Sequence, residues 1–270
     1  MRIDRNMAVE RIKKGTPCSF DMNPHSVQTH SKWLRNSLVG LSKPRVLDIG
    51  CGNGIYEQAL SDNCEEMFGI DLDVKALRIC REASVSADYI QANAEALPFA
   101  DSKFDAVMIV EVIEHVEDPL GCLSEVCRVL RPNGVIMITA PNRGYPFMTH
   151  GITIGSRWYD TLLGMPFPLV TYLPKAILKR IWSARCYTIS ELVHALEASG
   201  FDPQEGVFFM PAFDGVLSGT SKIPASIRRM AQSISTRFNL RESSWFGSTI
   251  AVTAVRKADH RRTGQDSSSG

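Results

Sequence analysis

Apolar runs alternate with amphipathic segments along most of the chain, and this alternation predicts its elements. Short continuous apolar runs are typical of strands buried in a parallel sheet, whereas apolar residues that recur every three or four positions predict helices. The predicted strands cover residues 46–49, 67–70, 88–91, 104–110, 135–139, 207–210 and 249–255. The predicted helices cover residues 26–39, 55–60, 74–83 and 122–130, and a further helix begins near residue 188. Strands that alternate with helices in this way predict a doubly wound α/β fold.

Polar residues and glycines stand at the ends of the first four predicted strands. The first strand carries Asp48 and runs directly into the glycine-rich stretch 50–54, and Asp71, Asn93 and Glu111 follow the next three. The carboxyl ends of the strands in such a sheet meet at one edge, where ligands bind. Because glycine has no Cβ and tolerates positive φ, a ligand can lie against this turn and the N–H groups of the following helix.

The charge of this edge discriminates between two kinds of nucleotide ligand. The carboxylates of Asp48 and Asp71, with two glutamates after the fourth strand, would repel a pyrophosphate but attract a cationic sulfonium. Asp71 stands 17 residues after Gly54, where its carboxylate can accept hydrogen bonds from both hydroxyls of a ribose. The glycine spacing is GxGxG rather than the GxGxxG of dinucleotide sites. The sequence therefore favours S-adenosylmethionine over NAD.

Five segments carry a resemblance to a known family. They are VLDIGCGNG (46–54), GIDLD (69–73), QANAEALPFADSKFDAV (91–107), EVIEHVEDP (111–119) and RVLRPNGVIMITAPN (128–142), with weaker similarity at 187–201. In order and spacing they resemble the motifs of class I S-adenosylmethionine-dependent methyltransferases, the large family that includes the ubiquinone-biosynthesis O-methyltransferases. The resemblance implies a Rossmann-like methyltransferase fold with a mostly parallel seven-stranded sheet. It is specific for fold and cofactor, and a poor guide to substrate.

The resemblance also implies a cofactor site at the ends of the first four strands. Its residues would be Asp48, Gly50, Cys51, Gly52, Asp71, Leu72, Asn93, Ala94 and Glu111. Asp48 and the glycine turn would hold the methionine end, and Asp71 would hold the ribose. Asn93 and Ala94 would contact the adenine, although the family more often has aspartate where Asn93 stands. An alternative role for Asp71 is the N-cap of the next helix, which Asp73 fits better.

Glu111, Glu114 and His115 form the candidate catalytic cluster. Their spacing predicts that they share one face of a helical turn. Relatives with the same E-x-x-E-H arrangement are metal-assisted, so the three residues could hold a divalent ion such as Mg2+, although many other relatives carry the EH pair here without metal. They could instead leave His115 and Glu114 to act catalytically, with His115 as the general base for a substrate hydroxyl. A third interpretation is that Glu114 and His115 only hydrogen-bond loops beneath the cofactor.

The domain organisation predicted from the sequence is a single methyltransferase domain with additions. The domain covers residues 41–256, preceded by an N-terminal helical extension (1–40) and followed by a disordered tail (257–270). Two long connections, 143–187 and 212–245, are expected to form a split helical cap. Connections this long, which contain none of the strands or helices of the basic methyltransferase fold, usually have a functional role.

Both insertions are basic and amphipathic. Residues 143–185 contain six basic side chains and one acid, and residues 215–241 contain five basic side chains and no acid. Apolar residues recur at helical spacing in 175–182 and 223–238. Such helices could bind an anionic membrane surface, could bind RNA, or could simply pack on the core.

Composition narrows the class and the expected compartment. A chain of 270 residues with 44% hydrophobic content can bury a full core, and it has no apolar run of about 18 residues that could span a bilayer. Its seven cysteines contain no CxxC pair, which predicts reduced thiols in a cytoplasmic protein that could associate with a membrane.

The sequence thus predicts methyl transfer from S-adenosylmethionine to a small apolar or lipid-like acceptor, with oxygen as the expected acceptor atom. Two alternatives stay open. An RNA methyltransferase would use the basic insertions and would bind RNA with steep salt dependence. A non-catalytic protein would bind the cofactor without turnover.

Overall fold

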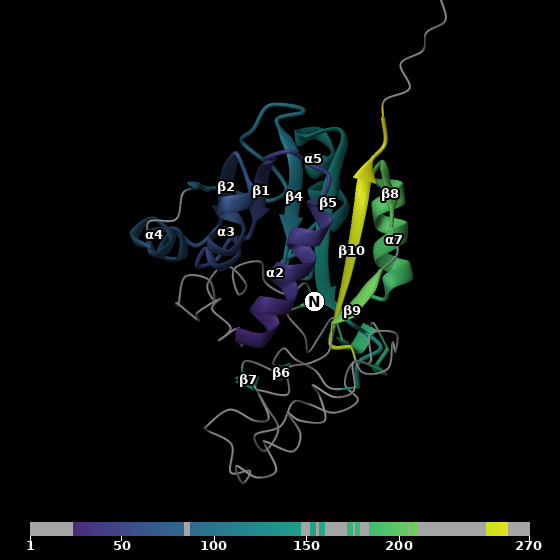
Figure 1. Cartoon of the computed structure of the whole chain (residues 1–270). Helices are drawn as coiled ribbons and strands as arrows, with labels where there is room; N and C mark the ends of the chain where they lie inside the picture. The colour runs from purple at the N-terminus through teal and green to yellow at the C-terminus, as the bar shows by residue number, and fades with distance from the viewer. Residues whose placement is uncertain are drawn as a thin grey trace, which may run out of the picture.

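One large sheet with helices on both faces forms the body of the protein (Figure 1). The computed structural model describes residues 24–83, 87–146, 152–154, 157–159, 172–174, 176–178, 184–204, 206–209 and 247–258. The strands are β1 (Arg45–Ile49), β2 (Glu66–Asp71), β3 (Asp88–Gln91), β4 (Phe104–Ile109), β5 (Leu130–Pro141), β6 (Ile152–Ile154), β7 (Arg157–Tyr159), β8 (Phe201–Pro203), β9 (Val207–Phe209) and β10 (Thr249–Arg256). The helices are α2 (Pro24–Ser37), α3 (Ile55–Leu60), α4 (Val74–Glu82), α5 (Pro119–Val129) and α7 (Ile189–Ala198), with a 3-10 turn at Ser61–Asn63.

The strand order confirms the predicted α/β fold and its mostly parallel sheet. The order is β3-β2-β1-β4-β5-β10-β8, and β9 also pairs with β10. The five strands from β3 to β5 pair in parallel, while β10 runs antiparallel to its neighbours. β8 and β9 lie on the same side of β10: β8 pairs with its residues 254–256 and β9 with its residues 249–251. The two short strands therefore share one position, and the eight strands of the sheet occupy seven positions. The predicted count of seven lacked the three-residue β8.

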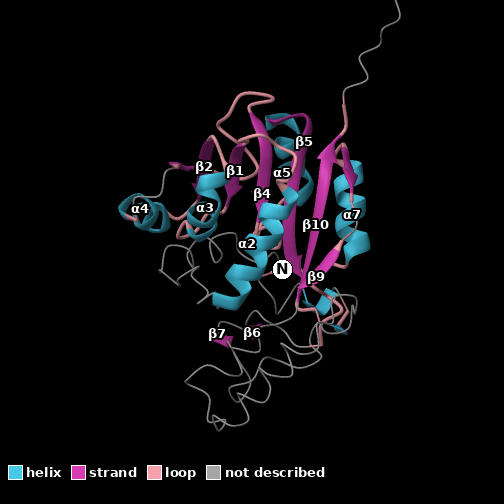
Figure 2. Ribbon diagram, viewed as in Figure 1, coloured by secondary structure: helices cyan, strands magenta, loops and turns pink. Residues whose placement is uncertain are grey.

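The two faces of the sheet carry separate halves of the core. β4 lies between β1 and β5 and is buried at every position, which is why its sequence is a continuous apolar run. Along β1, Val46 packs with residues of α2 and α3, whereas Leu47 packs with residues of α5 and α7. Helices α2 and α3 therefore cover one face and α5 and α7 the other. Figure 2 shows α2 crossing in front of the strands.

Much of the predicted helical cap lies outside the described residues. Within insertion 143–187 the structure describes the antiparallel pair β6–β7 and a helical turn at 176–178. Insertion 212–245, with its predicted amphipathic helix, falls wholly outside, so the cap stays a prediction. Within the described ranges, no helix has the length and hydrophobicity that a membrane crossing requires.

The two predicted terminal segments are described in part. The N-terminal extension is described from α2 onward, and residues 1–23 lie outside the description. In the predicted tail, Lys257 donates its backbone N–H to Gly200 O at 3.0 Å, so this residue still belongs to the folded body. Residues 259–270 lie outside the description.

Candidate cofactor site and active site

A tight turn after β1 forms the floor of the candidate cofactor site. Gly50, Gly52 and Gly54 have φ angles of 77°, 54° and 77°, in the left-handed region that glycine adopts without a steric penalty. The backbone N–H groups of Gly50 and Cys51 both donate to Ile70 O, at 2.7 and 3.0 Å. These two bonds fasten the turn to the end of β2.

Two of these glycines show what the turn has room for. A Cβ atom at Gly52 would meet no atom of the described residues within 4 Å, so on this part of the structure the backbone faces space that a ligand can enter. A Cβ atom at Gly50 would clash with the Val112 side chain. Gly50 therefore lets the turn pack directly against the segment after β4, which carries the predicted catalytic residues.

Asp71 holds the glycine turn and leads into α4. Its Oδ2 atom accepts from Gly52 N at 3.0 Å, and its Oδ1 atom accepts from Asp73 N at 2.8 Å. Asp73 is the N-cap of α4 and accepts from Lys75 N at 2.9 Å, which confirms the preference for Asp73 in this role. Each carboxylate oxygen of Asp71 keeps a second lone pair, so the carboxylate can still accept the hydroxyls of a ribose.

The predicted adenine contacts follow β3 at the same edge of the sheet. Asn93 is exposed, and its Oδ1 atom accepts from Glu95 N at 3.0 Å. Ala94 is half-buried, and Leu72 is an exposed apolar side chain after β2. Apolar side chains that stay accessible suit a flat heterocycle, although the oxygen of Asn93 already accepts from Glu95 N.

Asp48 and Glu57 are buried acids beneath this turn, with exposures of only 2% and 0%. Burial, with the neighbouring Glu57, raises the pKa of Asp48 well above its usual value, and burial raises the pKa of Glu57 to about 7. Within the described part of the chain, Asp48 Oδ2 and both carboxylate oxygens of Glu57 have no hydrogen-bond partner. Buried acids without a counter-charge suit a cationic ligand, so these residues fit a sulfonium donor. The sequence analysis identified Asp48 but missed Glu57.

The segment after β4 is a turn and not the predicted helical turn. Glu111 has a φ of 55°, which an α-helix cannot include, and α5 begins only at Pro119. The Glu111 N–H donates to Thr139 Oγ1 at 2.9 Å, and the Thr139 hydroxyl donates back to Glu111 Oε1 at 3.0 Å. The prediction that residues 111, 114 and 115 share a helical face is therefore wrong. Thr139, on the neighbouring strand β5, stabilises Glu111 in a conformation that the spacing could not indicate.

Glu114 and His115 lie side by side at the end of this turn. Glu114 is buried, 47% of the His115 side chain is exposed, and Glu114 Oε1 lies 3.8 Å from His115 Nε2. Burial raises the pKa of Glu114 well above its usual value. Desolvation lowers the pKa of His115 to about 4. Both shifts favour the neutral forms, and a neutral imidazole can accept a proton.

Metal binding gains no support from this arrangement. Among the described residues, no group of three His, Cys, Asp or Glu side chains is placed to hold a metal ion. The three predicted Mg2+ ligands are thus not brought together as a ligand cluster, since Glu111 is engaged by Thr139.

Arg185 fastens the same turn from the end of the first insertion. Its backbone N–H donates to Glu114 O at 3.0 Å, and its guanidinium donates to Val116 O and, at 2.9 Å, to Glu117 O. Arg185 therefore positions the backbone that carries Glu114 and His115. The sequence placed it only among the basic residues of the insertion, because nothing in its local pattern indicates a partner about 70 residues away.

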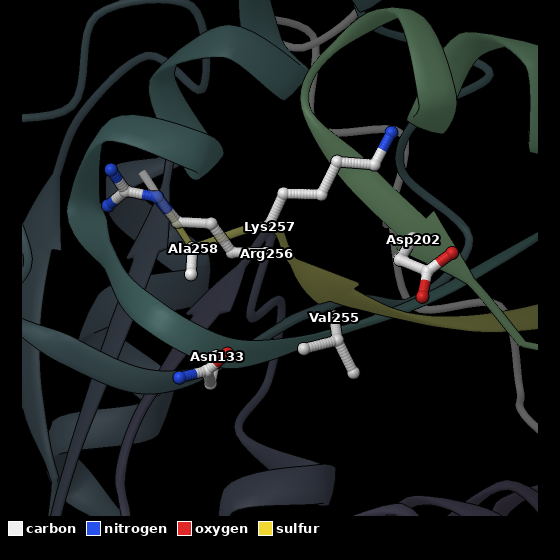
Figure 3. A pocket seen from close by; sticks show the side chains of 6 residues that line it. All are labelled: Asn133, Asp202, Val255, Arg256, Lys257 and Ala258. Carbon is white, nitrogen blue, oxygen red and sulfur yellow. The ribbon is translucent and has the colours of Figure 1, made fainter. Parts of the chain in front are cut away.

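A surface hollow of about 420 Å3 lies at the opposite edge of the sheet (Figure 3). Its lining residues are Asn133, Asp202, Val255, Arg256, Lys257 and Ala258. They gather where β10 ends, and β10 runs antiparallel to β5, so they are remote from the glycine turn. None of the predicted site residues lines this hollow.

Comparison with known proteins agrees with the geometry of the glycine turn. Residues 47–138 match a family model described as methyltransferase domain. The chain is 30% identical over 224 residues to the ubiquinone biosynthesis O-methyltransferase of Cereibacter sphaeroides (strain ATCC 17029 / ATH 2.4.9). That match covers 79% of this chain and 85% of the relative.

Solved structures support the same fold. The S-adenosylmethionine-dependent methyltransferase from Mesorhizobium loti superposes with a TM-score of 0.58 at 22% identity, over 85% of this chain and 100% of the other. The [4+2]-cyclase SpnF superposes with a TM-score of 0.58 at 18% identity, over 93% of each chain. At these identities the superpositions show the fold alone, and a cyclase among them illustrates that one fold supports different chemistries. The long match at 30% identity shows more, and the chain belongs to the class I S-adenosylmethionine-dependent methyltransferases.

Proposed function

We propose that this methyltransferase transfers the methyl group of S-adenosylmethionine to a hydroxyl oxygen of a small apolar or lipid-like acceptor, such as a phenol. Relatives named as O-methyltransferases of ubiquinone biosynthesis support the acceptor class, because the match covers 85% of their length. The observation that carries the proposal is the Glu114–His115 pair. It provides a neutral imidazole on the segment that packs against the glycine turn.

The donor is proposed to bind where the open glycine backbone meets the buried acids. Asp48 and the turn at Gly52 would hold its methionine end, Asp71 its ribose hydroxyls, and Asn93 with Ala94 its adenine. When bound, the donor supplies a methyl group already activated by a sulfonium. The protein then has to align the acceptor oxygen with the methyl carbon and exclude water.

His115 is proposed to remove the proton of the acceptor hydroxyl. With a pKa lowered to about 4, His115 is neutral at pH 7 but a weak base, so the transfer requires a neighbouring group that stabilises the protonated ring. The positive charge that forms on the ring would favour ionisation of Glu114, whose carboxyl lies 3.8 Å away. Arg185, by holding the backbone of Glu114, would keep the pair in place.

Exposed apolar side chains in the first insertion support a lipid-like acceptor. Tyr172, Leu173 and Ile177 are exposed large hydrophobic residues in an otherwise basic segment. Apolar side chains beside cations suit the surface of an anionic membrane.

We extend the proposal to membrane docking through both insertions. Deletion of residues 223–238 is expected to reduce co-sedimentation with anionic vesicles, and unchanged co-sedimentation would contradict docking through the second insertion.

The acceptor is tested by supplying methyl-labelled S-adenosylmethionine with one of three acceptors. These are a catechol with a prenyl chain, the same catechol without the chain, and total cellular RNA. We expect the label on a hydroxyl oxygen of the prenylated catechol, identified by mass spectrometry. Label recovered in RNA, or on nitrogen or carbon of the catechol, would refute the proposed acceptor atom and class.

The role of His115 is tested by His115→Gln in the same assay. The variant should lower kcat by about 10²–10⁴-fold, as expected for loss of a general base, while the Kd of S-adenosylmethionine stays unchanged. His194→Gln is the matched control, because His194 lies exposed on α7 beside Glu197. A wild-type kcat in His115→Gln would remove His115 as the base.

A further inference from the structure

Glu57 inserts its carboxyl group where a glycine leaves space in the sheet. Asp48, Gly69 and Tyr89 are register partners on β1, β2 and β3, so they form one row across three strands. A Cβ atom on Gly69 would lie 2.7 Å from Glu57 Oε1 and 2.8 Å from Tyr89 Cδ1. Glu57, which belongs to α3, therefore places its carboxyl above Gly69 and next to the carboxyl of Asp48.

No positive charge in the described part of the chain faces these two acids. The ion pairs found there all involve other residues. The titratable groups that face the pair are themselves acidic: Asp71, Tyr89, Cys51, Cys80 and Tyr56. The hydroxyl of Tyr56 is hydrogen-bonded to the ring of His30, whose pKa burial lowers to about 4, so that this ring is neutral at pH 7. The Asp48–Glu57 pair is therefore a buried acid pair in wholly acidic surroundings.

Two adjacent buried carboxyl groups cannot both stay ionised without a cation. A proton on one of them lets it donate a hydrogen bond to the other, which satisfies oxygen atoms that otherwise have no partner. The pKa values agree with this arrangement, because burial raises the pKa of both Asp48 and Glu57. The proton belongs to the pair and not to either residue alone.

We propose that the Asp48–Glu57 pair holds one proton while no cation is bound and releases it to solvent when S-adenosylmethionine binds. The carboxyl O–H bond breaks, its electron pair stays on the oxygen, and the proton passes to water. The positive charge of the donor then stabilises the doubly ionised pair. This proposal rests on the cofactor role in the proposed function, but it does not depend on the acceptor.

Methyl transfer reverses this balance. The by-product S-adenosylhomocysteine has a neutral thioether where the donor has a sulfonium, so it would bring one positive charge less to the Asp48–Glu57 pair. The ammonium of the methionine end stays, but the doubly ionised pair loses the stabilisation that the sulfonium gave, so its affinity for a proton from solvent rises and its attraction for the ligand falls. Glu57 is therefore a specificity-determining residue that makes the site favour the donor over its by-product.

Titration calorimetry tests this directly on the full chain. Each ligand is titrated at pH 6.5 in two buffers of different ionisation enthalpy, which gives the number of protons released on binding. We expect S-adenosylmethionine to release more protons than S-adenosylhomocysteine, by up to about one. At pH values below the pKa of the pair, the Kd of S-adenosylmethionine should decrease by up to about tenfold for each unit that the pH is raised, and the Kd of S-adenosylhomocysteine should change less.

Glu57→Gln supplies the matched variant. The amide keeps the size of the side chain and can donate to Asp48, but it cannot release a proton, so the difference between the two ligands should disappear. Glu82→Gln, at the exposed end of α4, should behave as wild type. Equal proton numbers for the two ligands in the wild-type protein would overturn the proposal without any variant. Failure of both ligands to bind would overturn the cofactor assignment and this proposal together.

Discussion

Gly69→Ala is a sharp test of the packing beneath the glycine turn. The substitution adds one methyl group in the middle of β2, where the added carbon would lie 2.7 Å from Glu57 Oε1. The second obstacle is the ring of Tyr89, whose Cδ1 and Cε1 atoms would both lie 2.8 Å away. Contacts below 3.0 Å cannot persist, so either side chain or the strand must move.

The expected cost follows from two opposing terms. Forcing a methyl group into a filled core destabilises by about 1–3 kcal/mol. Replacing glycine by alanine at a backbone conformation that alanine accepts returns about 0.4–1 kcal/mol, because the unfolded chain loses freedom. Gly69 does not have a positive φ, so this second term applies. The net loss should be roughly 1–2 kcal/mol, a fall in Tm of a few degrees.

Urea unfolding of four proteins separates the contributions of the two contacts. They are the wild type, Gly69→Ala, Glu57→Ala and the double variant. If Glu57 is the main obstacle, Gly69→Ala should cost about 1 kcal/mol less in the Glu57→Ala background, because the smaller side chain leaves space. Contact with Tyr89 should leave a small residual cost. Identical costs in the two backgrounds would refute the placement of Glu57 above Gly69.

Three further predictions concern the same edge of the sheet. Gly50→Ala should abolish cofactor binding in calorimetry, because the added carbon meets Val112. Gly40→Ala is the control and should bind normally, since Gly40 also has a positive φ but its added carbon would meet no described residue within 4 Å. Asp71→Asn should weaken binding by about tenfold or more, since it removes charge-assisted acceptors for the ribose, and an unchanged Kd would exclude the ribose role. The free energy of unfolding of the wild type, measured in urea, should decrease as pH rises from about 5 to 7, and that of Glu57→Gln should decrease less. The reason is that the pKa of Glu57 is higher in the folded than in the unfolded protein, so ionisation of this carboxyl stabilises the unfolded chain.

Much of the fold could be predicted because its signals lie within single segments. The helix predicted at 55–60 has the same bounds as α3, and the strand predicted at 46–49 begins one residue late. The start of β5 shows the limit of this reasoning. The strand begins at Leu130, five residues before its prediction, because the polar stretch 131–134 enters the sheet through a register shift and a positive φ at Asn133. The strand β8 was missed because its three residues, Phe201–Pro203, include an aspartate and a proline and form no apolar run, unlike the apolar residues of β9.

The cofactor edge was predictable for a related reason, and the catalytic turn was not. Asp48 and Asp71 follow strands whose ends must meet at one edge, so their proximity follows from the fold. The conformation of Glu111 depends on Thr139, which stands 28 residues later in the chain. A spacing of three and four residues indicates a shared face only if the segment is helical. Here the segment is not helical, because the hydrogen bonds between Glu111 and Thr139 on the neighbouring strand stabilise a turn.

Glu57 and Gly69 show why the chemistry of this site exceeds what a local pattern can carry. In the sequence, Glu57 is an acid on a short helix and Gly69 is a small residue in a strand, and neither is unusual alone. Their role depends on the strand register, which aligns Asp48, Gly69 and Tyr89 in one row across the sheet. It also depends on α3, which places the carboxyl of Glu57 in the space that Gly69 leaves. An acid facing only other acids must either hold a proton or meet a cation. The proton balance of cofactor binding is therefore a property of three strands and a helix packed together, and substitution of the glycine should disturb it as surely as substitution of the acid.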